Sequence, residues 1–200
     1  MSESRDEMGK RNIAQLLLAS VIVLLLLAGC SARNQTKSFM RKEVDLSYIQ
    51  NVAVLPFENL GGGAGAAQRT REIIMTQVLA SGLFNVVDKG RVDSTLRTEA
   101  IEPGTPIDGP TLRRLGQRLE TQAFLLGSVE QAADARTGGA VYPEISLTLR
   151  LIDAESGSVL WQSSGRGSGY SLMDRLFGVT PKNSFQVTLD LVSKMLVTIR

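Results

Sequence analysis

The sequence predicts an α/β domain in which a mixed β-sheet is packed with helices, in the order β-α-β-α-α-β-β-β-α. In the first half of the chain, short apolar runs alternate with segments of helical spacing. In the second half, apolar and polar residues alternate strictly over residues 145–151, the period of a strand with one buried face. With 200 residues, 43% of them hydrophobic, the chain can fill the core of one such domain.

The first strand, helix and strand follow one another closely. Residues 49–55 form a mostly apolar run that predicts a buried strand, which Pro56 ends. Residues 68–80 have helical spacing, and Gly82 is placed as their C-terminal cap. The short apolar run 84–87 predicts the second strand.

Two helices and a strand come next. Asp88 is placed to cap a helix over residues 91–100. Asp108 and the proline two residues later open another helix, whose leucines form an apolar stripe up to Leu119. The apolar run 123–129 predicts the third strand.

The last three elements begin with a β-hairpin. The strand over 145–151 is followed by a glycine-containing turn and by a returning strand over 159–164. Trp161 lies on that returning strand, where a core position is favoured over an exposed one. Residues 184–199 then predict a helix with Phe185 on its apolar side.

A glycine-rich stretch matches the pattern of a dinucleotide-binding loop. Gly61, Gly63 and Ala66 have the G-x-G-x-x-G/A spacing, and Asp88 stands where a ribose-binding acid would be. Residues 56–60 nevertheless separate the glycines from the strand end, where such a loop must begin. We therefore predict no nucleotide binding and expect a mobile connection, in which paired Gly61 and Gly63 to Ala changes alter stability only modestly.

The N-terminus has the features of an export signal. Lys10 and Arg11 precede the apolar block 13–28, which ends in Leu-Ala-Gly29-Cys30. This ending resembles the bacterial lipobox, in which cysteine receives a diacylglycerol and the signal is removed before it. The resemblance implies cleavage between Gly29 and Cys30. The alternative is a plain N-terminal anchor helix with an incidental cysteine.

The lipobox resemblance divides the chain into three parts. Residues 1–29 are the expected signal peptide, residues 30–46 a lipidated polar tether, and residues 47–200 the periplasmic domain. Ser31 follows the cysteine, instead of the aspartate associated with inner-membrane retention, which implies the periplasmic face of the outer membrane. The lipid bilayer, contacted through acylated Cys30, is therefore the first expected partner.

Composition argues against several classes of function. The 22 basic and 20 acidic residues give a net charge of +2, which predicts no nucleic-acid partner. The chain has no histidine, and Cys30 is its single cysteine. No carboxylates or serines form a motif for catalysis. We therefore expect no enzyme, no metal site and no cofactor.

A glycine-flanked segment near residue 170 is unusually apolar. It carries five large apolar side chains: Tyr170, Leu172, Met173, Leu176 and Phe177. One interpretation is a lid over the domain's own core, and the other is a docking segment for a partner protein or a second subunit.

Four stretches in order resemble a known family. They are Val-Ala-Val-Leu-Pro-Phe-Glu-Asn-Leu at 52–60, Leu-Phe-Asn-Val-Val-Asp at 83–88, Phe-Leu-Leu-Gly-Ser-Val at 124–129, and the hairpin 146–161. Together they are similar to the periplasmic domains of CsgG-type secretion lipoproteins and LpoB-type activators of cell-wall synthases, with a related fold in the N-terminal domain of TolB.

This resemblance implies a non-enzymatic module that binds other envelope proteins, with self-association left open. The module would act as scaffold or activator of a cell-wall synthase, a secretion system or a polysaccharide-export machine. The alternative is a subunit of a CsgG-type outer-membrane secretion pore.

Overall fold

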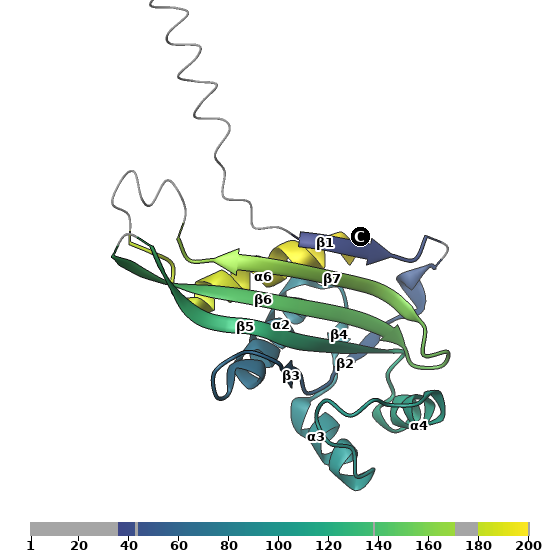
Figure 1. Ribbon diagram of the computed structural model, residues 1–200. Helices are drawn as coiled ribbons and strands as arrows, with labels where there is room; N and C mark the ends of the chain where they lie inside the picture. The colour runs from purple at the N-terminus through teal and green to yellow at the C-terminus, as the bar shows by residue number, and fades with distance from the viewer. Residues whose placement is uncertain (1–35, 43, 138, 171–179, 200) are drawn as a thin grey trace, which may run out of the picture. The chain divides into compact units, whose positions relative to one another are not determined.

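A seven-stranded mixed sheet with helices on both faces forms the domain, which confirms the predicted α/β class (Figure 1). The computed structural model describes residues 36–42, 44–137, 139–170 and 180–199. All of these belong to one of the two units into which the chain divides, Asn34–Tyr170 with Thr180–Arg200. Gly29 and Cys30 lie outside the described residues.

The strands lie in the order β1-β7-β6-β5-β2-β4, and β3 pairs with β5 beyond the end of β2. Pairing is parallel among β4, β2 and β5, and antiparallel from β5 through β6 and β7 to β1. The bounds are β1 (Thr36–Met40), β2 (Asn51–Val54), β3 (Glu58–Asn59), β4 (Asn85–Val86), β5 (Ala123–Thr137), β6 (Ala140–Asp153) and β7 (Val159–Ser168).

The described helices are η1 (Leu46–Tyr48), α2 (Ala66–Ser81), α3 (Lys89–Thr98), α4 (Gly109–Leu119), α6 (Ser184–Leu196) and η2 (Val197–Ile199). Five of the described helices begin at side-chain caps or at a glycine, and the sixth, η2, continues directly from α6. Asp88 accepts a hydrogen bond from the Arg91 amide at 3.0 Å, as predicted, and Asp108 accepts one from the Thr111 amide at 2.9 Å. The Thr111 hydrogen bond also holds the pKa of Asp108 below its usual value.

Two hydrophobic layers lie on opposite faces of β2. Val52 and Val54 pack with α2 and α6, whereas Ala53 and Leu55 pack with α3 and α4. In Figure 1 the sheet passes in front of α6. Trp161 is completely buried in the α2–α6 layer and donates its indole N–H to the Thr198 hydroxyl at 2.9 Å, so its predicted core position is confirmed.

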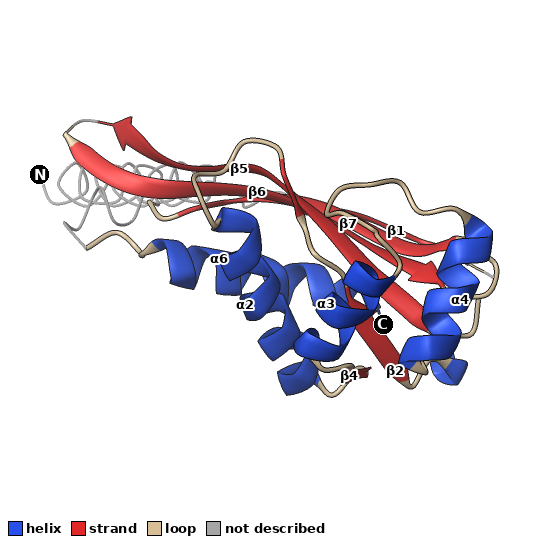
Figure 2. Ribbon diagram, turned by 90° about the horizontal axis from the view of Figure 1, so that it is seen from below, coloured by secondary structure: helices blue, strands red, loops and turns tan. Residues whose placement is uncertain are grey.

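β5 and β6 are longer than the sequence predicted. The strand expected at 123–129 continues to Thr137, and the strand expected at 145–151 begins earlier, at Ala140. No strand or helix was expected over residues 130–144. The paired ends of β5 and β6 project beyond α6 (Figures 1 and 2). This projecting ribbon lacks a buried face over much of its length, so its sequence shows no apolar alternation.

β1 lies within the range 30–46 that was expected to be a tether, so that prediction is wrong for Thr36–Met40. The strand pairs antiparallel with β7, with Thr36 opposite Gly165 and Met40 opposite Trp161. It is an edge strand whose Lys37 and Phe39 are exposed. Such a strand is held by backbone hydrogen bonds and carries little hydrophobic pattern.

The glycine-rich connection between β3 and α2 is pinned to β5, which corrects the expectation of a mobile loop. Gly62 forms a bridge with Ala132, and its amide donates to the Asn59 side-chain oxygen at 2.8 Å. A Cβ on Gly61 would lie 2.1 Å from the backbone oxygen of Glu130. Glycine is needed there because two backbones approach too closely for any side chain.

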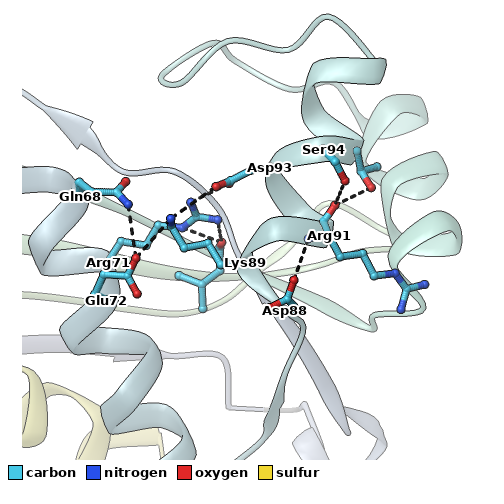
Figure 3. A network of polar contacts seen from close by, with 10 residues as sticks. Gln68, Arg71, Glu72, Asp88, Lys89, Arg91, Asp93 and Ser94 are labelled. Carbon is cyan, nitrogen blue, oxygen red and sulfur yellow. Dashed lines mark hydrogen bonds and ion pairs between the residues drawn. The ribbon is translucent and has the colours of Figure 1, made fainter.

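A buried arginine joins α2 to the end of β2 (Figure 3). Arg71 is 1% exposed and donates to the Val54 carbonyl through Nη2 at 2.7 Å and Nε at 3.1 Å. Its Nη1 pairs with Asp93 of α3 at 2.7 Å. Lys89 completes the group at 3.7 Å from Asp93 and 3.3 Å from Glu72.

We expect Arg71→Met to lower the free energy of unfolding by about 3 kcal/mol or more, because it leaves the Val54 carbonyl and Asp93 without their partner. The matched control is Arg97→Met, which changes an exposed arginine of α3 and should alter stability by less than about 0.5 kcal/mol. Urea unfolding followed by the fluorescence of Trp161 measures both. Equal effects of the two changes would contradict the proposed role of Arg71.

The glycine connection gives a second paired comparison. Gly61→Ala should destabilise the domain by about 1–3 kcal/mol, because the new methyl group collides with the Glu130 carbonyl. Gly63→Ala should change stability by less than about 1 kcal/mol, because no atom lies within 4 Å of the added Cβ. The same urea titration measures both variants. A Gly61→Ala variant as stable as Gly63→Ala would contradict the prediction, because the connection would then shift enough to accommodate the methyl group.

Candidate functional site

An apolar groove lies between the first turns of α2 and α6 and the projecting parts of β5 and β6. We call it the α2–α6 groove; its volume is about 510 Å³. The apolar side chains that line it come from all four elements: Ala66, Ile73, Ala132, Ala133, Pro143, Ile145 and Phe185. A concave, largely apolar surface of this size can receive side chains of a partner protein.

Phe185 is the most conspicuous residue of the groove. Its side chain is 56% exposed, which corrects the prediction that it lies on the buried side of the last helix. That side is instead formed by residues such as Val187 and Leu191. Asn183 and Gln186 form a reciprocal capping box that fixes the first turn of α6, and this turn holds Phe185 at the rim.

Charges of both signs surround the apolar floor. Arg69 donates to the Ala64 carbonyl at 3.1 Å, and Glu144 accepts from Arg166 and, at 3.4 Å, from Gln131. Asp134 is exposed and lines the same groove. A mixed polar rim around an apolar floor is typical of surfaces that bind proteins.

The described residues that flank the predicted lid or docking segment lie beside the groove. The Gly169 amide donates to the Pro143 carbonyl at 2.8 Å, and the Lys182 amide donates to the Gly169 carbonyl at 2.9 Å. Tyr170 is partly buried and stacks on Tyr142, with ring centroids 5.1 Å apart. Leu172, Met173, Leu176 and Phe177 lie outside the described residues, so the choice between lid and docking segment stays a prediction.

The residues of the dinucleotide pattern serve the fold. Asp88 caps α3, and Gly61 lies against β5. In open α/β sheets, ligands bind in a crevice at the carboxyl ends of strands where the chain reverses its winding direction. Here that place lies between β2 and β5, where β3 pairs with β5 at Glu58 and Asn59. The pocket beside Glu58 has a volume of only about 40 Å³.

Several of the ionisable and hydroxyl groups weighed as catalytic candidates are engaged in ion pairs or buried in the fold. Glu99 lies 2.9 Å from Arg118 and 3.4 Å from Arg114. Lys182 pairs with Asp190, and Ser163 is completely buried. Over the described ranges, no group of three or more histidine, cysteine, aspartate or glutamate residues is placed to hold a metal ion.

Sequence reasoning missed both Arg71 and the α2–α6 groove. Arg71 did carry a signal, because a cation adjoins Thr70 and Ile74 on the buried face of a helix. The groove had none, since Ile73, Ala132 and Phe185 meet only when four elements are placed in three dimensions.

Within the part of the chain that the structure describes, no helix is both long enough and apolar enough to cross a membrane.

No protein-family model matches the chain, and no curated protein matches it. Among solved structures, the chain is similar to the PelC dodecamer from Paraburkholderia phytofirmans, with a TM-score of 0.57 and 18% identity over 84% of this chain and 97% of that one. It is also similar to lipoprotein GNA1162 from Neisseria meningitidis, with a TM-score of 0.57 and 18% identity over 75% and 97%. At these identities the likeness establishes a shared fold.

The resemblance to LpoB-type domains has a weaker structural counterpart. The LpoB C-terminal domain from Salmonella enterica matches with a TM-score of 0.45 and 16% identity, over 60% of this chain and 81% of that one. This score is too low to carry an argument. The CsgG and TolB parts of the resemblance stay predictions. The chain therefore has the fold of PelC and of the lipoprotein GNA1162.

Proposed function

We propose that the chain is a lipid-anchored, non-enzymatic module at the periplasmic face of the outer membrane that binds other envelope proteins. It acts as a scaffold or activator of an envelope machine, which is a cell-wall synthase, a secretion system or a polysaccharide-export system. The observation that carries this proposal is the α2–α6 groove with Phe185 at its rim.

The exposure of Phe185 favours binding to a protein partner, which would bury its ring. An exposed phenylalanine beside an open apolar groove gains free energy when a partner removes both from water, about 1.5–3 kcal/mol for the ring alone. The rim supplies Arg69 and Asp134 for polar contacts that set orientation. A second copy of the chain is one candidate partner, and the fold shared with the PelC dodecamer supports that choice.

Lipid anchoring rests on the sequence. The ending Leu-Ala-Gly29-Cys30 supports cleavage before Cys30 and acylation of its thiol, and Ser31 supports the outer membrane as destination. The fold shared with lipoprotein GNA1162 is in keeping with this proposal. The apolar segment from Tyr170 to Phe177 is proposed as a further docking surface, because its start adjoins the groove at Pro143.

The anchor is tested by changing the two residues at the proposed cleavage site. Cys30→Ala should leave an unprocessed precursor, because acylation of the thiol precedes cleavage. Ser31→Asp should be processed normally but remain in the inner-membrane fraction. Immunoblots of fractionated cells measure both, and normal maturation of Cys30→Ala would rule the lipoprotein assignment out.

The docking surface is tested by photo-crosslinking from three phenylalanine positions in living cells. A benzophenone side chain at position 185 or 177 should crosslink to the same envelope protein. The matched control is position 39, where Phe39 is 53% exposed on the edge strand β1 and should give no such product.

Affinity measurements complete the test. With the captured partner, Phe185→Ser should weaken binding about tenfold or more without lowering the melting temperature. Equal crosslinking from position 39, or loss of binding that follows unfolding, would contradict the docking role of the groove.

A further inference from the structure

A polar cleft opens at the amino end of β2, where η1, the C-terminal half of α4 and the turn after β6 meet. Its volume is about 460 Å³. The residues that carry the following argument are Tyr48, Arg113, Gln117, Gln122, Asp153 and Glu155. No part of the protein-binding proposal uses this cleft.

An aromatic side chain stands fixed at the cleft. The Tyr48 hydroxyl donates to Asp153 Oδ2 at 2.7 Å, while Asp153 Oδ1 accepts from the Ser156 amide at 2.7 Å and the Ser156 hydroxyl at 2.6 Å. Asp45 caps the η1 turn that carries Tyr48. The tyrosine is nevertheless 46% exposed, so it is held in place while part of its surface stays open to a ligand.

The protonation states keep this arrangement constant around neutral pH. Partial burial and the neighbouring Asp153 carboxylate raise the pKa of Tyr48 to about 12. Burial favours the neutral acid at Asp153, but hydrogen bonds from Ser156 and Tyr48 outweigh it and lower the pKa of that carboxyl. Tyr48 therefore stays a donor and Asp153 an anion.

Planar polar groups around the cleft keep unused hydrogen-bonding capacity. Gln122 Oε1 accepts from the Asn51 amide at 2.8 Å and the Gln50 amide at 3.1 Å, which fixes the side-chain amide. Its Nε2 has no acceptor among the described residues and can donate to a ligand. Arg113 uses Nη1 toward the Glu155 carbonyl at 3.2 Å and has further N–H groups. Gln117 is exposed, and its amide has no partner among the described residues.

We propose that this cleft binds a neutral saccharide. Neighbouring hydroxyls of a pyranose ring both donate and accept, which suits the forked groups of Gln117, Gln122 and Arg113, and the apolar face of the sugar suits the tyrosine ring. The carboxylates of Asp153 and Glu155 outweigh the cationic Arg113, and the third carboxylate of the cleft, Glu120, pairs with Arg91, so the cleft offers no net positive charge to an anionic ligand.

Saccharide binding is measured on the full chain in a detergent without sugar headgroups, such as an amine oxide. Chitotriose, cellotriose and maltotriose are titrated by calorimetry, and saturation-transfer NMR reports which sugar protons contact the protein. We expect at least one of them to bind with a Kd of about 1 mM or tighter. Trigalacturonate, which carries three carboxylates, should bind more weakly than the best neutral sugar.

Matched variants locate the binding site. Gln117→Ala and Arg113→Ala should each weaken binding about 2- to 12-fold, the effect of losing one hydrogen bond. The controls are Gln68→Ala and Arg97→Ala, which remove exposed side chains of the same types from α2 and α3 and should leave the Kd unchanged. Melting temperatures show that all four variants are folded.

Tyr48→Ala and Tyr48→Phe separate the ring from its hydroxyl. Loss of binding in Tyr48→Ala with retention in Tyr48→Phe is the result expected for a tyrosine that presents its ring face. No binding of the three neutral sugars at concentrations up to about 10 mM would overturn the proposal, because a Kd above that concentration is too weak for a specific saccharide site. Tighter binding of trigalacturonate, or equal effects of Gln117→Ala and Gln68→Ala, would overturn it as well.

Discussion

The contact between the Arg71 guanidinium and the Val54 carbonyl is the constraint on which the parallel half of the domain depends. β4 pairs with β2 only at Asn51 and Val52, so the Val54 carbonyl has no strand beside it on that edge. A buried carbonyl without a donor is costly, and Arg71 supplies two N–H groups from α2. Its third donor reaches Asp93, which ties α3 to the same point.

This contact connects the two hydrophobic layers. α2 belongs to the layer on one face of β2, and α3 belongs to the layer on the other face. Because Arg71 bonds both the Val54 carbonyl of β2 and Asp93 of α3, it ties the two layers together at the end of the strand. The end of β2 is then free to turn at Pro56 and continue as β3, which completes the pairing with β5.

The sequence predicted the buried elements well because burial leaves a pattern. Leu147, Leu149 and Leu151 alternate with half-exposed or exposed residues, and that period alone places a strand. Asp88 similarly marked a helix start through its capping chemistry. Elements that hide little apolar surface left no such pattern. β1 and the projecting ribbon of β5 and β6 depend on backbone pairing, which is compatible with almost any side chain.

The two candidate surfaces were beyond prediction for a different reason. The α2–α6 groove and the polar cleft each combine residues that lie far apart in the chain, such as Ile73 with Phe185 and Tyr48 with Asp153. No local period encodes such a meeting. The glycine-rich stretch was misjudged for a related reason: its composition predicted a mobile connection, whereas its glycines allow a close approach of two backbones at Glu130.

β6 relates the two surfaces in space. Pro143 lines the α2–α6 groove near the start of the strand, and Asp153 lines the polar cleft at its end. At about 3.3 Å per residue, the ten intervening steps separate the surfaces by roughly 30 Å. β6 is paired along much of this length on both sides, with β5 and β7, so the distance is fixed.

A fixed separation has a consequence for binding. The groove and the cleft share no lining residue, so a saccharide in the cleft leaves the residues of the groove open to a protein partner. If the two ligands belong to one assembly, engagement of the first raises the effective concentration of the second. A weak saccharide contact, of about millimolar strength, then suffices to align a protein partner along a glycan chain.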